Sequence, residues 1–210
     1  MDNPSATKHL LKYRASAIIG TRALAAAIAL AMPALSYAER VDPPAVPAAI
    51  QVPAGNTAFL VGHAVGTQNY VCLPANAGFA WTLSTPQATL FNDSGRQIIT
   101  HYFSPNPMEN GTMRVTWQHS TDTSTVWAQA LPPSSDPAFV APGAIPWLLL
   151  RVVGAHRSST DGDTLSATTY VHRVNTSGGV APSTGCSVST EVGNRAFVPY
   201  TANYVFYSDR

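Results

Sequence analysis

The sequence predicts an all-β protein, a single antiparallel sandwich or barrel of about ten short strands with little helix. From Thr57 onward, short runs of β-branched and aromatic residues are separated by turn residues about every eight to twelve positions, which is typical of such folds. The turn sequences Asp93-Ser94-Gly95, Asn110-Gly111 and Asp161-Gly162-Asp163 supply positive φ at low cost. No 3.6-residue apolar period continues beyond the N-terminal leader, so we expect little helix.

Residues 1–38 have the pattern of a cleaved signal peptide. A basic segment precedes an apolar run from Ala23 to Leu35, and Ser36-Tyr37-Ala38 places small residues at the two positions that a signal peptidase recognises. The run is too short to span a bilayer and contains Pro33, which disfavours a retained anchor. We therefore expect cleavage after Ala38 and an exported protein, periplasmic or extracellular.

Two segments follow the leader: a proline-rich extended arm over residues 39–56, and one β-domain over residues 57–210. The arm composition favours extended chain over helix or central strand, either as a spacer or lying on the domain. The expected strands are Thr57 to Val65, Gln68 to Leu73, Phe79 to Leu83, Ala88 to Phe91, Gln97 to Phe103, Met113 to His119, Thr125 to Leu131, Trp147 to Val153, Thr164 to Val174 and Phe197 to Tyr207.

The connection from Leu131 to Pro146 breaks the regular spacing of these strands. Its five prolines cannot sustain a strand ladder, and connections of this length are uncommon in compact domains and often functional. An equal alternative is a surface excursion that crosses one end of the barrel.

Cys72 and Cys186 are the only cysteines, and both follow the leader. In an oxidising compartment they predict one disulfide, with two separate buried thiols as the alternative. Neither stands in a CxxC or CxxH spacing, so a metal role is not favoured.

The charge pattern excludes several partners. Both lysines lie in the leader, and the remaining arginines are scattered from Arg40 to Arg210, whereas nucleic acids and anionic membranes need clustered positive charge. Short, proline-interrupted strands do not predict the ten-residue spans of an outer-membrane barrel. A small molecule or a glycan is the expected partner, and the oligomeric state stays open.

Three histidines follow the apolar faces of three predicted strands, because strand alternation places residues two apart on one face. His63 lies with Val61, His101 with Ile99 and Phe103, and His119 with Trp117. They could converge on a metal or substrate, but single histidines on half-buried strands are more often hydrogen-bonded core residues, and no local ligand pair predicts a metal. His101 and His119, each with a nearby carboxylate, are the catalytic candidates.

Motifs for other chemistries are missing from the sequence. It contains no GxSxG elbow and no GxGxxG after a strand, so neither a serine hydrolase of that type nor a dinucleotide cofactor is predicted. We predict no cofactor.

A candidate binding surface contains Trp147, Tyr170, Arg173 and Asn175, near Gly178-Gly179. Exposed aromatic rings bind sugars and apolar ligands, whereas buried rings build the core. A glycine pair after a strand can cradle an anion with help from Arg173, and the alternative is a simple turn.

Several ordered segments together resemble one known family. They are Gly66 to Cys72, Ala88 to Phe91, His101 to Phe103, Ile145 to Leu150, Arg173 to Pro182 with Gly185-Cys186, and Val198 to Tyr207. From about Val52 to Tyr207 the chain resembles the exported bacterial and fungal family known as domain of unknown function 3455. The resemblance implies an exported single domain and no activity or site residue. The sequence thus predicts a ligand- or envelope-binding module, with an extracytoplasmic hydrolase as the alternative.

Overall fold

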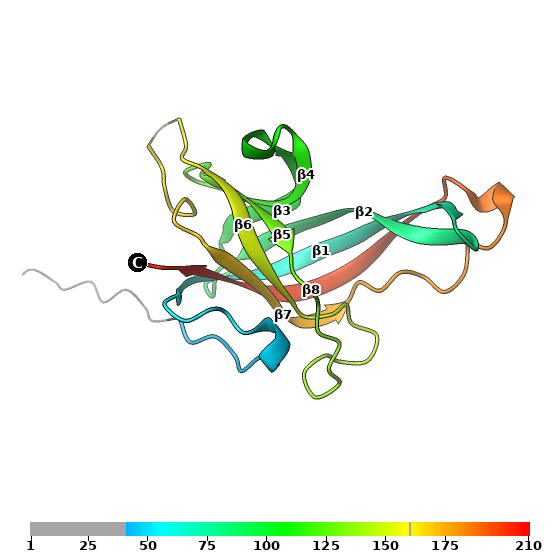
Figure 1. Cartoon of the computed structure of the whole chain (residues 1–210), viewed down its shortest axis with the longest axis horizontal. Coiled ribbons are helices and arrows are strands. Elements are labelled where there is room, and N and C mark those ends of the chain that lie inside the picture. The colour runs from blue at the N-terminus through cyan, green and yellow to red at the C-terminus, as the bar shows by residue number, and fades with distance from the viewer. Residues whose placement is uncertain (1–40, 160) are drawn as a thin grey trace, which may run out of the picture. The chain divides into compact units, whose positions relative to one another are not determined.

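The computed structural model describes residues 41–159 and 161–210, which contain a closed barrel of eight antiparallel strands (Figure 1). Each strand pairs with the next along the chain, and β8 closes the barrel by pairing with β1. The expected signal peptide and the first two residues of the predicted arm lie outside the described residues. The strands are β1 (Thr57–Ala75), β2 (Gly78–Phe91), β3 (Gln97–Asn106), β4 (Thr112–His119), β5 (Thr125–Ala130), β6 (Leu148–His156), β7 (Tyr170–Gly178) and β8 (Arg195–Ser208).

Helical structure in the described residues is limited to three 3-10 turns, η1 (Ala48–Ile50), η2 (Pro107–Glu109) and η3 (Ser189–Glu191). The all-β prediction is therefore confirmed. No helix in this part of the chain is long and apolar enough to cross a membrane.

Eight strands replace the ten expected because four predicted strands merge into two. β1 continues through Gly66-Thr67, and β2 continues through the segment around Pro86, where the predicted strands were interrupted. Gly66 is needed for this pairing: a Cβ there would lie 2.1 Å from the Gln87 carbonyl oxygen. The glycine thus permits close strand approach and does not mark a turn. The strand expected from Thr164 begins only at Tyr170.

The barrel interior is filled by alternate residues of its strands. Tyr200, Ala202, Tyr204 and Phe206 of β8 all belong to this buried cluster. At one end the segment Thr164–Thr169 adds Leu165, which is fully buried and whose backbone N–H donates to Ser124 Oγ. This end is therefore packed shut.

A second buried cluster covers part of the outer face of the barrel. It joins Ile50 of the proline-rich segment 41–56, Val140 and Trp147 of the connection 131–147, and Val174 and Val205 of the barrel. His172, between them in β7, donates from Nε2 to the Ile50 carbonyl oxygen (2.6 Å) and lies 3.0 Å from the Tyr207 hydroxyl. Both proline-rich segments therefore pack against the barrel wall.

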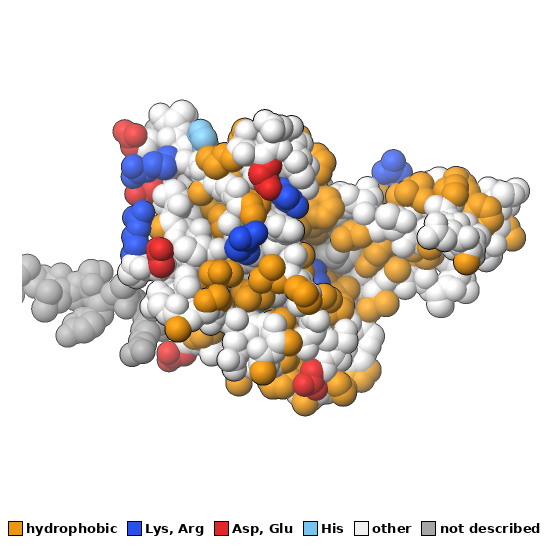
Figure 2. Space-filling model, viewed as in Figure 1, with side chains coloured by type: hydrophobic (Ala, Val, Ile, Leu, Met, Phe, Trp, Pro, Cys, Tyr) orange, Lys and Arg blue, Asp and Glu red, His pale blue; other side chains and the backbone are white. Residues whose placement is uncertain are grey.

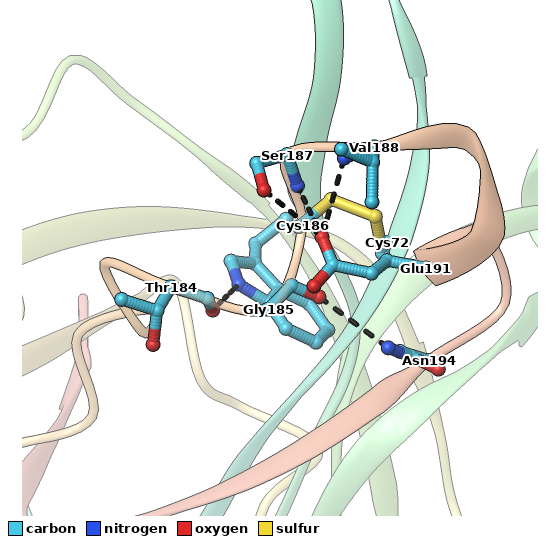
Figure 3. The surroundings of a disulfide bond; sticks show 9 residues. Cys72, Thr184, Gly185, Cys186, Ser187, Val188, Glu191 and Asn194 are labelled. Atoms are coloured by element: carbon cyan, nitrogen blue, oxygen red, sulfur yellow. Dashed lines mark hydrogen bonds between the residues drawn. A yellow bond between two sulfur atoms is a disulfide. The ribbon is translucent and has the colours of Figure 1, made fainter.

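The far halves of β1 and β2 and the start of β8 project beyond the barrel (Figure 1). Cys72 in this projection forms the predicted disulfide with Cys186, with 5.4 Å between their Cα atoms (Figure 3). The Trp81 indole N–H donates to the Thr184 carbonyl beside it (3.0 Å). Hydrophobic side chains gather along this part of the surface (Figure 2), including exposed Leu73, Leu83 and Phe197. The disulfide thus fixes the segment that precedes β8 onto the hairpin.

Candidate functional site: a cavity inside the barrel

A cavity of about 200 Å³ occupies the barrel interior toward the end from which the β1–β2 hairpin projects. Its lining comes from all eight strands: Gln68, Leu83, Pro86, His101, Phe103, Val115, Trp117, Ala130, Leu148, Leu150, Arg173 and Tyr204. Leu83 and Ala130 are exposed, whereas Trp117 and Tyr204 are buried, so the cavity runs inward from a mouth to an aromatic floor.

The mouth lies where β2 and β3 separate. The ladder between these strands covers only Ala88 to Phe91, paired with His101 to Gln97. Beyond it, Pro86 of β2 and Phe103 of β3 border the cavity, and their strands are linked by the bond from Phe103 N–H to Thr85 Oγ1 (3.2 Å). The long β1–β2 hairpin leaves the barrel here, so its length creates the opening.

His101 and Trp117 form the floor as a stacked pair, with ring centroids 4.5 Å apart and planes 14° apart. The imidazole Nδ1 donates to the Thr116 carbonyl oxygen at 2.9 Å, which leaves Nε2 as the acceptor of a neutral ring. Burial is the main cause that lowers the pKa of His101 to about 3, with a smaller contribution from the Arg173 charge. His101 is therefore neutral at ordinary pH and a very weak base.

Arg173 is the cationic residue of the cavity. Strand alternation in β7 points it into the barrel with Val171, while Tyr170 and Val174 pack on the outer face. Its Nη2 donates to the Pro146 carbonyl oxygen at 2.9 Å, and its Nε is buried without an acceptor. No Asp or Glu lines the cavity, and Arg173 has no ion pair within the described part of the chain.

Trp117 Nε1 is a further buried donor without a hydrogen-bond acceptor. Gln68 Nε2 has none at ordinary hydrogen-bond geometry, although burial raises the pKa of Tyr200 and an interaction with Gln68 opposes that rise. Trp117 is fully buried and Gln68 is 2% exposed. Buried polar groups are normally paired, and an unpaired one costs about 1–3 kcal/mol. The Trp117 N–H is therefore an unused donor enclosed next to the cavity, and a small local shift would bring it into contact with a ligand there.

Tyrosine hydroxyls complete the polar side of the barrel interior. The hydroxyls of Tyr200 and Tyr204 lie 3.2 Å apart. Burial raises the pKa of Tyr204, and Arg173 opposes that shift through its charge and through a hydrogen bond to the same hydroxyl. These hydroxyls thus stay protonated and can donate or accept.

His119 lies away from this cavity, at the β4–β5 turn. Its Nδ1 is 3.0 Å from Asp122 Oδ1, but Asp122 also accepts hydrogen bonds from the backbone and hydroxyls of Ser124 and Thr164. Although burial opposes them, these bonds hold the pKa of Asp122 well below its usual range. In this cluster the Asp122 carboxylate lies between Ser124 and His119, whereas in a catalytic triad the histidine lies between the serine and the carboxylate. This arrangement therefore does not activate Ser124 as a nucleophile. This cluster ties Thr164 to the β4–β5 turn.

The three histidines do not converge. His63 lies on the outer wall, with Nδ1 2.9 Å from Asn203 Oδ1 and Nε2 2.7 Å from Asp93 Oδ1. The hydrogen bond to Asn203, followed by that to Asp93, raises the pKa of His63. Within the described residues, no three potential ligands from His, Cys, Asp and Glu are grouped to hold a metal ion.

The four residues of the predicted binding surface are divided between the faces of the barrel. Arg173 lines the cavity, whereas Trp147 and Tyr170 belong to the outer cluster. Asn175, in the left-handed region with φ of 51°, borders an outer groove of about 830 Å³ with His63. At the glycine pair, Gly178 pairs with Tyr200 of β8 and Gly179 forms a bridge with Ala144, while the Gly179 N–H donates to the Pro199 carbonyl oxygen and its carbonyl accepts from the Tyr70 hydroxyl. These backbone groups are therefore used in pairing with neighbouring segments.

Sequence reasoning singled out His101 and Arg173 but missed Gln68, Trp117 and Tyr204 as their neighbours. Alternation correctly placed His101 on the face of Ile99 and Phe103. The remaining neighbours come from strands far apart in sequence, and only the order of strands around the barrel brings them together.

Comparison with known proteins gives one match. The sequence model of the family described as "Protein of unknown function (DUF3455)" matches residues 53–208, nearly the whole β-domain. Neither the curated proteins nor the solved structures contain a match to the chain.

Proposed function

Because this chain belongs to the DUF3455 family, whose description assigns no activity, we propose its function from the barrel interior: it is an exported binding protein for a small organic molecule. The observation that carries the proposal is the cavity of about 200 Å³ lined by apolar side chains, Arg173 and Gln68, with the unpartnered N–H group of Trp117 buried next to it. A ligand that accepts a hydrogen bond from this N–H group would recover the free energy that its burial costs.

The size of the cavity limits the ligand. Pockets for drug-sized molecules are typically about 300–1,000 Å³, so this one suits a single small molecule better than a glycan chain. The walls contributed by Val115, Leu148 and Leu150 favour an apolar body. Export is part of the proposal because the leader pattern and the Cys72–Cys186 disulfide both fit an oxidising compartment.

A binding role is better supported than hydrolysis. The neutral, weakly basic His101 has no carboxylate partner on the cavity wall, and neither His119 nor Asp122 lines that cavity. Neither candidate histidine therefore has the base and orienting acid that hydrolysis needs.

The proposal is tested by filling the cavity. Val115→Phe places a ring at the cavity wall, and Val65→Phe makes the same change on an exposed outer position. Benzamide and hexanamide serve as small neutral probes, followed through the Trp117 indole N–H signal by NMR, with Trp147 in the outer cluster as internal reference.

We expect the probes to shift the Trp117 signal and leave that of Trp147 in place. Val115→Phe should weaken binding at least tenfold, and Val65→Phe should not. The proposal is wrong if neither these probes nor their carboxylate counterparts move the Trp117 signal, or if Val115→Phe binds them as the wild type does.

A further inference from the structure

We propose that the ligand of this cavity is a small carboxylate with an apolar body, and that Arg173 pairs with its carboxylate group. This inference rests on the proposed binding function and names the chemical class of the ligand. Its basis is the placement of one permanent positive charge in a cavity whose other walls are neutral.

Arg173 carries a charge that no acidic residue of the cavity wall balances. An arginine side chain stays protonated under all ordinary conditions, and even a half-buried charge such as that of Arg173 gains from a partner of opposite charge. Arg173 lines the cavity without an Asp or Glu beside it, and no ion pair to it exists within the described residues. The chain thus supplies no counter-charge here, and an anionic ligand would.

The hydrogen bonds of the guanidinium leave part of it without a partner. One side of the guanidinium is held by the bond from Nη2 to the Pro146 carbonyl (2.9 Å), which belongs to the proline-rich connection packed on the barrel. The Nε–H has no acceptor and is enclosed by the protein, so a ligand in the cavity reaches it through a small shift of the guanidinium. A carboxylate oxygen is a strong acceptor for such a group, because charge-assisted hydrogen bonds are about twice as strong as neutral ones.

The volume and the walls of the cavity limit the rest of the ligand. A volume of about 200 Å³ corresponds to roughly six or seven water molecules at about 30 Å³ each, enough for one ring or a short chain. Phe103, Leu148 and Leu150 contact that space with apolar surface. An inorganic anion would leave these walls uncovered, so the observations favour an organic acid.

The neutral state of the surrounding groups gives the guanidinium a specific role. His101 donates to Thr116 and stays uncharged, and the tyrosine hydroxyls stay protonated. Discrimination between a carboxylate and a neutral isostere therefore depends on Arg173.

The experiment compares matched pairs of probes on the protein that begins at Glu39, at pH 7 and low salt. Benzoate is compared with benzamide and hexanoate with hexanamide, with inorganic phosphate as an anion that lacks an apolar body. Affinities come from titration calorimetry and from the Trp117 indole signal. The variants are Arg173→Met, Arg173→Lys and, as a matched control, Arg195→Met on the exposed start of β8.

In the wild type and in Arg195→Met, we expect at least one carboxylate to bind tenfold or more tightly than its amide, and phosphate not to compete. Arg173→Met should abolish this preference, and Arg173→Lys should retain part of it, because lysine keeps the charge but loses the planar fork. Thermal unfolding of each variant establishes that it is folded.

Each contrary result has a separate meaning. If both amides bind as tightly as their acids in the wild type, or if Arg173→Met and Arg173→Lys both keep the preference, the inference is wrong while the binding function stands. If no probe of either class moves the Trp117 signal, the binding function itself is wrong. Phosphate competition at the affinity of the acids would overturn the organic-acid class.

Discussion

His101 links burial to the acid sensitivity of the fold. Burial lowers its pKa to about 3, while in the unfolded chain it titrates near the ordinary value of 6.5. Between about pH 3 and pH 6.5, His101 binds a proton in the unfolded state but not in the folded state. The free energy of unfolding therefore falls as pH falls through this window, by about 1.4 kcal/mol per pH unit from this residue, and the contribution is constant above pH 6.5.

The slope of the free energy of unfolding against pH gives a prediction for His101→Gln. Glutamine keeps an N–H donor for the Thr116 carbonyl but cannot take up a proton in this range. Urea unfolding at pH 7, 6 and 5 should show a shallower fall in stability for the variant than for the wild type. His172, whose pKa burial also lowers, keeps part of the slope in both proteins. Equal slopes would mean that His101 is not buried as described.

At the scale of the elements, the long β1–β2 pairing depends on backbone contact at Gly66. A Cβ at this position would lie 2.1 Å from the Gln87 carbonyl oxygen and 2.6 Å from the Ala88 Cα, both backbone atoms that cannot move alone. At Gly62 the nearest atoms all belong to the Leu90 side chain, with Cδ2 at 2.7 Å and Cβ at 3.0 Å, so the contact is less close and does not involve backbone atoms.

Gly66→Ala should therefore lower the free energy of unfolding by roughly 3 kcal/mol or more, and the matched variant Gly62→Ala by about 1 kcal/mol. Guanidinium unfolding followed by circular dichroism measures both. Similar stability of the two variants would contradict the close approach of β1 and β2 at Gly66.

The same elements show how far the sequence predicts the fold. Alternation and turn chemistry predicted the all-β class and most strand positions, because those signals are local. The predicted strands stop on either side of Gly66 and of Pro86, since nothing local distinguishes a glycine between two strands from one inside a strand that meets its neighbour closely. His101 and Arg173 were identified as candidates, but their meeting in one cavity follows from barrel closure, which depends on pairings across the whole chain.

At the scale of the whole molecule, the Cys72–Cys186 disulfide joins residues 114 positions apart. Such a crosslink restricts the unfolded chain, and a loop of this length contributes about 4–5 kcal/mol in the chain-entropy account. The bond also fixes the segment before β8, whose Gly193 N–H donates to the Cys72 carbonyl at 2.9 Å.

Replacing both cysteines by serine should lower the free energy of unfolding by roughly 4 kcal/mol while leaving the cavity able to bind its probes, since the bond lies in the projecting hairpin. Thr82→Ala, at an exposed position of the same hairpin, is the control and should change little. Intact mass with and without reductant establishes the bond in the wild type. A loss under 1 kcal/mol would show that the crosslink does not restrain the unfolded chain in this way.

The separation of β2 from β3 beyond Ala88 also has a kinetic consequence. Since no ladder joins the strands at the cavity mouth, widening that seam breaks one hydrogen bond, from Phe103 to Thr85, together with the side-chain packing around it. A molecule could then enter and leave while the remaining ladders stay intact. Exchange of the ligand would need only this local opening and no partial unfolding of the barrel.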